Sequence, residues 1–209
     1  AFDDAIRHAI TKMSHLHFTS TEDYRKRVIQ LGEEPDRVFN VGALGVENVM
    51  KNDFMSKEEI EQSLNFKMTD KCFLCTYHPV TLSDMSSEAQ VLNLLEALDD
   101  YKDYHIIFTY SNSDTDSQII IKRIQEYVDR NVGRCMFIPS LGQRRYFSAL
   151  RYMTAVLGNS SSGIIEVPSF GIPTLNIGDR QKGRIAADSV VNCGCSTEDI
   201  KAGLAKVVA

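Results

Sequence analysis

Short apolar runs alternate with amphipathic stretches along most of this chain. The runs predict strands at residues 16–19, 38–41, 72–77, 105–110, 135–138, 155–157, 173–177 and 190–192. Between most of them, apolar residues recur at helical spacing, as at Val91, Leu94, Leu95 and Leu98. Strand–helix alternation with nearly continuous apolar strands predicts an α/β fold, in which a parallel sheet is covered by helices on both faces.

Local signals mark where several helices begin. Ser56 with Glu59, and Ser20 with Asp23, have the spacing of a capping box, and Ser196 precedes the final helical pattern. The segment 42–45, Gly-Ala-Leu-Gly, interrupts the pattern and is a point at which the chain could pass from one domain to another.

A turn rich in serine and glycine follows the strand predicted at 155–157. It reads Gly-Asn-Ser-Ser-Ser-Gly over residues 158–163 and leads into an apolar helix start at 164–167. The first N–H groups of a helix lack internal partners, so such a turn can bind a phosphate. Glu166 lies about one turn into that helix, where its carboxylate could accept hydrogen bonds from a ribose. The alternative is that Ser160 or Ser161 only caps a helix.

Ligands of parallel sheets bind beyond the carboxyl ends of the strands. The polar residues that follow the predicted strands are His78, Asn112 with Asp114, Ser140, the turn at 159–163, and Gly-Asp-Arg-Gln at 178–181. His78 could donate to a phosphate, or it could be a loop histidine. Asn112 could contact a ligand or only start the next helix. Arg180 suits a phosphate, with a solvated surface arginine as the alternative.

Composition excludes several classes of function. The formal net charge of the 209 residues is −5 and no dense basic patch occurs, which argues against a nucleic-acid partner. No apolar run is long enough to span a bilayer, and the opening residues are Asp-rich and helical in pattern rather than typical of a signal peptide. Most of the five cysteines lie in strand-like segments, so we expect no metal site, no disulfide framework and a reducing cytoplasm.

Three motifs together resemble the hydrolysing UDP-N-acetylglucosamine 2-epimerases, most closely the branch that serves sialic acid synthesis. They are Tyr-His-Pro-Val-Thr at 77–81, the turn and helix start at 158–167, and the stretch from Phe170 to Arg184 that contains Gly-Asp-Arg-Gln-Lys-Gly-Arg. The opening residues 3–15 are similar to that branch as well.

The resemblance implies a GT-B architecture, in which two Rossmann-like domains face each other and the second holds most of the nucleotide. It implies that Ser160, Ser161 and Gly163 bind the diphosphate, that Glu166 binds the ribose, and that Asn112 and Arg180 lie near the phosphates or the sugar. His78 would assist the departure of UDP. The family reaction converts UDP-N-acetylglucosamine and water into N-acetylmannosamine and UDP, and no cofactor is expected.

The family's members are about twice as long as this chain, and the acidic residues that move the C2 proton lie in their first domain. We therefore expect residues 1–40 to be the tail of an N-terminal Rossmann-like domain and residues 41–209 to be the C-terminal UDP-binding domain. Alone, the chain would bind UDP weakly and turn nothing over, and the whole protein would form a homodimer. A GT-B glycosyltransferase and a non-catalytic nucleotide-sugar sensor are the alternatives.

Overall fold

The computed structural model describes residues 2–80, 85–109 and 116–209, and the chain divides into two compact units, residues 1–51 and 52–209. The first unit contains α1 (Phe2–Met13), β1 (His17–Thr19), α2 (Glu22–Gln30), η1 (Pro35–Arg37), β2 (Val38–Asn40) and α3 (Leu44–Met50). Strands β1 and β2 pair in parallel, and Phe18 stacks on Phe39 with ring centroids 5.7 Å apart.

One predicted helix cap is wrong by a single residue. Thr21, and not Ser20, is the N-cap of α2, because its extended backbone lets its side-chain hydroxyl accept from the Tyr24 N–H. The capping box at Ser56 and Glu59 is confirmed, as is the cap at Ser196, which accepts from the Asp199 N–H.

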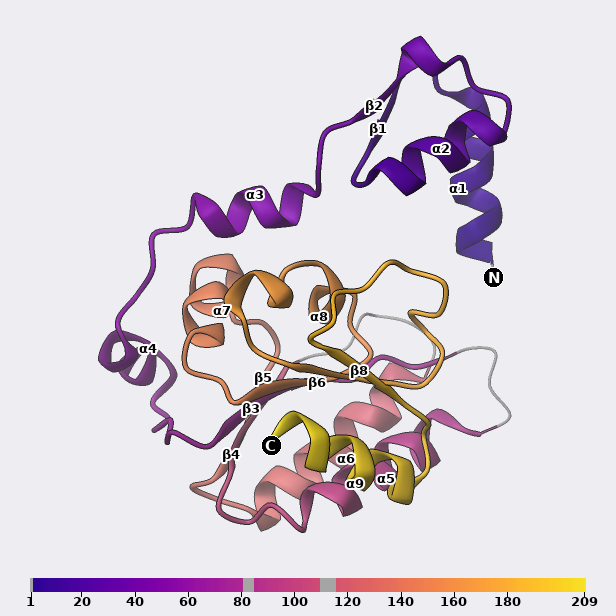
Figure 1. Cartoon of the computed structure of the whole chain (residues 1–209). Coiled ribbons are helices and arrows are strands. Elements are labelled where there is room, and N and C mark those ends of the chain that lie inside the picture. The colour runs from indigo at the N-terminus through magenta and orange to yellow at the C-terminus, as the bar shows by residue number, and fades with distance from the viewer. Residues whose placement is uncertain (1, 81–84, 110–115) are drawn as a thin grey trace. The chain divides into compact units, whose positions relative to one another are not determined.

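The second unit carries the large sheet (Figure 1). Its strands are β3 (Cys72–Thr76), β4 (His105–Thr109), β5 (Cys135–Ile138), β6 (Ala155–Gly158), β7 (Thr174–Ile177) and β8 (Val190–Cys193). They are ordered β5-β4-β3-β6-β7-β8, and every neighbouring pair is parallel. The parallel sheet predicted from the apolar runs is confirmed.

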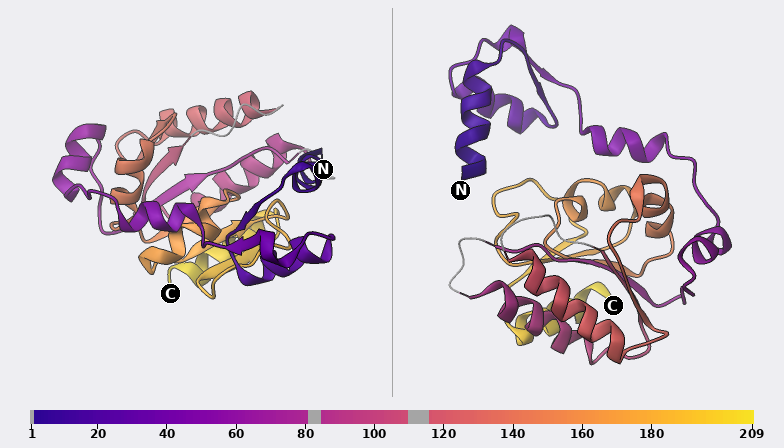
Figure 2. Two further views of the ribbon diagram at one scale, coloured as in Figure 1. Left: turned by 90° about the horizontal axis from the view of Figure 1, so that it is seen from above. Right: turned by 180° about the vertical axis from the view of Figure 1, so that it is seen from behind.

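Helices cover both faces of this sheet. α5 (Ser87–Leu98), α6 (Ser117–Arg130) and α9 (Thr197–Val207) lie on one face, and α7 (Gly142–Leu150) and α8 (Ser162–Ile165) lie on the other (Figure 1). From behind, α5 and α6 are seen side by side (Figure 2). The core beneath α5, α6 and α9 consists of side chains such as Phe73, Leu94, Phe108, Ile120 and Leu204, all fully buried. None of the described helices is long and apolar enough to cross a membrane.

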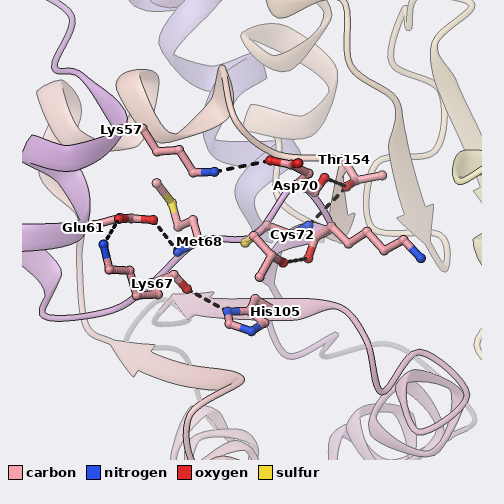
Figure 3. A network of polar contacts seen from close by, with 10 residues as sticks. Lys57, Glu61, Lys67, Met68, Asp70, Cys72, His105 and Thr154 are labelled. Carbon is pink, nitrogen blue, oxygen red and sulfur yellow. Dashed lines mark hydrogen bonds and ion pairs between the residues drawn. The ribbon is translucent and has the colours of Figure 1, made fainter.

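A polar network secures the amino-terminal edge of the sheet (Figure 3). Glu61, from α4 (Lys57–Leu64), is buried and accepts from the Met68 N–H at 2.8 Å and from Lys67 Nζ at 2.6 Å. The pKa of Glu61 is lowered, first by the Lys67 hydrogen bond and then by the Met68 N–H. His105 Nδ1 lies 2.7 Å from the Lys67 carbonyl oxygen, so this histidine belongs to the scaffold at the edge opposite the carboxyl ends of the strands.

Candidate functional site

The order of the strands creates one place where a ligand is expected. From β3 the chain adds β4 and then β5 on one side, and it returns to place β6 on the other side of β3. A parallel sheet binds its ligands at such a switch point, beyond the carboxyl ends of the two strands from which the chain departs in opposite directions. The residues that follow β3 and β6 include His78 and the turn at 159–163.

The end of β6 is shaped by a glycine. Gly158 has a φ of +123°, and a Cβ at this position would lie 2.0 Å from the carbonyl oxygen of Thr76 on β3. Only glycine fits both that backbone conformation and that close approach. The tight exit from β6 brings the next residue, Asn159, directly against the end of β3.

Asn159 is fully buried and binds the backbone of His78 at both polar groups. Its Oδ1 accepts from the His78 N–H at 2.7 Å, and its Nδ2 donates to the His78 carbonyl oxygen at 2.8 Å. The pattern along the chain did not predict this contact, because it joins residues far apart in the sequence. The signal in the sequence was an Asn at the end of an apolar strand, where a buried amide needs partners.

Ser160 and Ser161 form the tight turn after Asn159. Their carbonyl oxygens accept from the N–H groups of Gly163 at 3.2 Å and Ile164 at 3.1 Å. Within the described part of the chain, the N–H groups of Ser160 and Ser161 themselves donate to no acceptor. Two adjacent unpaired N–H groups beside a switch point are suited to bind an anion.

The helix that follows is shorter than the sequence pattern predicts. α8 ends at Ile165 and is followed by a 3-10 turn, η2 (Val167–Phe170). Pro168 explains the early end, since it has no N–H to continue the α-helical ladder. So short a helix has a small dipole, so the feature of this turn that suits an anion is the pair of serine N–H groups rather than the helix dipole.

Gly163 has a packing contact. Its N–H is already bonded within the turn, its carbonyl oxygen accepts from Thr174 Oγ1 at 2.8 Å, and a Cβ would lie 2.7 Å from Thr174 Cγ2. The glycine therefore lets the turn lie directly on β7. The contact between Gly163 and a diphosphate stays a prediction.

Glu166 follows α8 and presents an unsatisfied acceptor. Its Oε2 is buried and has no hydrogen-bond partner among the described residues. Burial raises the pKa of this carboxyl group, while a hydrogen bond from Ser162 opposes the shift. Ser162 Oγ is in turn hydrogen-bonded to the hydroxyl of Tyr146 on α7. A buried carboxylate oxygen without a donor is costly, so it is a place where a ligand's hydroxyl group would fit.

The loop after β7 reaches back to the same turn. Arg180 Nη1 donates to the Asn159 carbonyl oxygen at 3.1 Å, and the buried Gln181 donates to it through Nε2 at 2.8 Å. Gln181 Oε1 is buried without a partner in the described residues. The sequence places Gln181 in the polar loop at 178–181, but it assigns no role to this residue. A hollow of about 440 Å³ lies beside this loop, lined among others by Ile164, Asn176, Gln181, Arg184 and Asn192.

Of the predicted site residues, the structure links His78 and Arg180 through Asn159, and it places Ser160 and Ser161 next to Asn159 in the chain. Glu166 lies one short helix further on. Asn112 lies outside the described residues.

A sequence model of the family described as UDP-N-acetylglucosamine 2-epimerase matches residues 1–209. The chain belongs to the UDP-N-acetylglucosamine 2-epimerase family. The family resemblance inferred from the three motifs is confirmed.

Two curated proteins are similar to this chain over nearly its whole length. The chain is 43% identical over 204 residues to the polysialic acid biosynthesis protein P7 of Escherichia coli, covering 97% of this chain and 51% of that protein. It is 42% identical over 192 residues to the hydrolysing GDP/UDP-N,N'-diacetylbacillosamine 2-epimerase of Campylobacter jejuni, covering 92% of this chain and 50% of that protein. The chain thus spans about half the length of these relatives.

Solved structures of other proteins share the fold of this chain. The UDP-GlcNAc 2-epimerase of Methanocaldococcus jannaschii, solved with UDP-GlcNAc and UDP, matches with a TM-score of 0.70 at 16% identity, covering 94% of this chain and 55% of that one. The Neisseria meningitidis enzyme bound to UDP-GlcNAc matches with a TM-score of 0.66 at 18% identity, covering 95% and 53%. The predicted Rossmann-like fold, as part of a GT-B architecture, is confirmed.

Proposed function

We propose that this chain is the nucleotide-binding part of a hydrolysing UDP-N-acetylglucosamine 2-epimerase, which converts UDP-N-acetylglucosamine and water into N-acetylmannosamine and UDP. Family membership supports the reaction class, and two relatives bear the word hydrolysing in their names. The observation that carries the assignment of the site is the pair of unpaired N–H groups at Ser160 and Ser161, a few residues before the unsatisfied carboxylate of Glu166.

In this proposal the turn binds the diphosphate and Glu166 binds the ribose. The N–H groups of Ser160 and Ser161 donate to phosphate oxygens, and the Glu166 carboxylate accepts from the ribose hydroxyl groups. The guanidinium of Arg180 contributes positive charge near the phosphates. Asn112 is proposed as a further contact to the phosphates or the sugar, on the strength of the family resemblance alone.

The chemistry begins with the loss of UDP. A base takes the C2 proton, the C1–O bond breaks, and its electron pair leaves on the diphosphate, which gives a 2-acetamidoglucal. His78 assists by donating to the departing oxygen, and the serine N–H groups stabilise the charge that develops on the diphosphate. Water then adds to C1, and a proton returns to C2 from the opposite face, which yields N-acetylmannosamine. The base for the C2 proton is proposed to come from the other half of the complete enzyme.

Residues 1–40 are proposed to be the tail of the N-terminal domain, with the nucleotide-binding domain running from residue 41 to 209. The parallel pair β1–β2 supports this assignment, because an isolated two-stranded parallel pair is marginal and needs further strands beside it. Its aromatic residues are also open to solvent, Phe18 at 66% and Phe39 at 43%. We further propose that the complete enzyme is a homodimer.

Two measurements test the proposal. Isothermal titration of the chain with UDP is expected to show weak, saturable binding, and incubation with UDP-N-acetylglucosamine is expected to release no UDP. Absence of UDP binding at millimolar concentration would refute the nucleotide site, whereas steady UDP release would refute the assignment of the base to another part of the enzyme. For the complete enzyme, free N-acetylmannosamine supports the epimerase, and a sugar transferred to an acceptor supports a GT-B glycosyltransferase.

A further inference from the structure

Asn159 holds together three loops that end at the switch point. Its side chain binds both polar groups of the His78 backbone after β3, at 2.7 and 2.8 Å, and its own backbone begins the turn after β6. Its carbonyl oxygen accepts from Arg180 and from Gln181 after β7, at 3.1 and 2.8 Å. The side chain is fully buried, so solvent cannot replace these partners.

The two bonds to His78 require an amide at position 159. A carboxamide offers an acceptor and a donor side by side, which matches the N–H and the C=O of one residue. An aspartate has the same shape but only acceptors. It would therefore place two oxygen atoms against each other at the His78 carbonyl, and it would bury a charge.

We propose that Asn159 is a positioning residue: its side chain fixes His78, and its backbone carbonyl oxygen holds Arg180, beside the turn at Ser160 and Ser161, so that His78, Arg180 and the turn address one diphosphate. This inference rests on the proposed function. Asn159 acts through its neighbours, since its own polar groups are already used by His78, Arg180 and Gln181.

The test compares Asn159→Asp with a control variant at the other edge of the sheet, where another buried side chain binds a backbone N–H. Glu61→Ala removes a buried side chain that also binds a backbone N–H, at Met68, but it lies at the amino ends of the strands. UDP affinity is measured for the wild-type chain, Asn159→Asp, Glu61→Ala, His78→Ala and the double variant His78→Ala with Asn159→Asp. Urea unfolding of each variant shows how much of the chain is folded.

Asn159→Asp is expected to weaken UDP binding by about 10-fold or more, because a group misaligned with the diphosphate loses its hydrogen bond. Glu61→Ala is expected to stay within about twofold of wild type, since it acts on stability alone. In the double variant the two losses should not add, because Asn159 acts partly through His78. Equal affinities for Asn159→Asp and Glu61→Ala, or full additivity with His78→Ala, would overturn the inference.

A second readout does not depend on UDP. In NMR spectra of the free chain at constant pH, Asn159→Asp is expected to shift the backbone N–H and imidazole resonances of His78, and Glu61→Ala is expected to leave them in place. Unchanged His78 resonances in a folded Asn159→Asp chain would refute the positioning role. Failure of the wild-type chain to bind UDP would instead refute the proposed function, while the NMR comparison would still decide the contact.

Discussion

Replacing Glu166 by Gln separates the effect of this buried carboxylate on stability from its effect on nucleotide binding. Its Oε2 lacks a partner in the described residues, and burial raises its pKa. At pH values between the pKa of Glu166 in the unfolded chain and its raised pKa in the folded chain, the folded chain binds more protons than the unfolded one. Glu166 therefore lowers the stability of the chain as pH rises through that window. Above the window the penalty is fully present. Glu166→Gln removes the charge, so the free chain should be as stable as wild type or more stable at neutral pH.

Nucleotide binding should change in the opposite direction. A hydrogen bond to a charged acceptor contributes about 1.5–3 kcal/mol, compared with about 1 kcal/mol for a neutral one. If the carboxylate accepts from two ribose hydroxyl groups, the difference is about 0.5–2 kcal/mol for each bond. The amide should therefore lose about 1–4 kcal/mol of binding free energy, or about 5- to 1,000-fold in affinity. The ribose needs the ionised form of Glu166 as its acceptor. The affinity of the wild-type chain for UDP should therefore rise with pH through the pKa of Glu166, and binding should release a proton.

The assay is isothermal titration of both chains with UDP and with 2',3'-dideoxy-UDP, paired with urea unfolding across the same pH range. The dideoxy ligand lacks the hydroxyl groups, so it should bind the wild-type chain weakly and be nearly insensitive to Glu166→Gln. Equal loss of affinity for both ligands would show that Glu166 does not contact the ribose. A free Glu166→Gln chain that is less stable than wild type at neutral pH would contradict the burial argument.

Three further predictions concern the scaffold. Gly158→Ala should lower the free energy of unfolding by about 3 kcal/mol or more, because of the backbone conformation at residue 158 and the overlap of the new Cβ with Thr76. Gly171→Ala, at a φ of +69° with nothing within 4 Å of the new Cβ, should lower it by only about 1 kcal/mol. Similar urea midpoints for the two variants would refute this prediction. Glu61→Ala should lower the free energy of unfolding by about 1–3 kcal/mol at neutral pH. Because the pKa of Glu61 is lowered in the folded chain, the difference in stability between wild type and variant should shrink as pH falls through that pKa. A stability difference independent of pH would refute the role of the charge. Burial raises the pKa of Cys72 to about 12, so its thiol should not react with Ellman's reagent at pH 8 until urea unfolds the chain. Rapid labelling of Cys72 in the native chain, located by mass spectrometry, would contradict its burial.

The elements of the fold were predictable because their signals are local. An apolar run such as 72–76 is buried on both faces, and the Ser56–Glu59 capping box spans a single turn. The polar residues at the strand ends were also predictable, since parallel strands all present their carboxyl ends at one edge. Thr21 caps α2 in place of Ser20 because its backbone is extended and its hydroxyl reaches the Tyr24 N–H, and residue type alone does not determine which of two neighbouring hydroxyl residues has that geometry.

What the sequence did not predict depends on contacts between distant segments. The switch point requires the order of β3 and β6, which local patterns do not contain. The bonds between Asn159 and His78 follow from that order, so their partners could not be identified beforehand. The length of α8 depended on Pro168, whose effect outweighed the apolar run around it.

A crystal structure of the chain soaked with UDP would show directly whether the turn at Ser160 and Ser161 binds the diphosphate. Phosphate oxygens are expected to accept from the N–H groups of Ser160 and Ser161 at about 2.7–3.2 Å, with a ribose hydroxyl group on Glu166 and His78 beside the phosphates. UDP bound in the hollow beside β7 and β8 with the serine N–H groups untouched, or no bound UDP at millimolar concentration, would contradict this expectation.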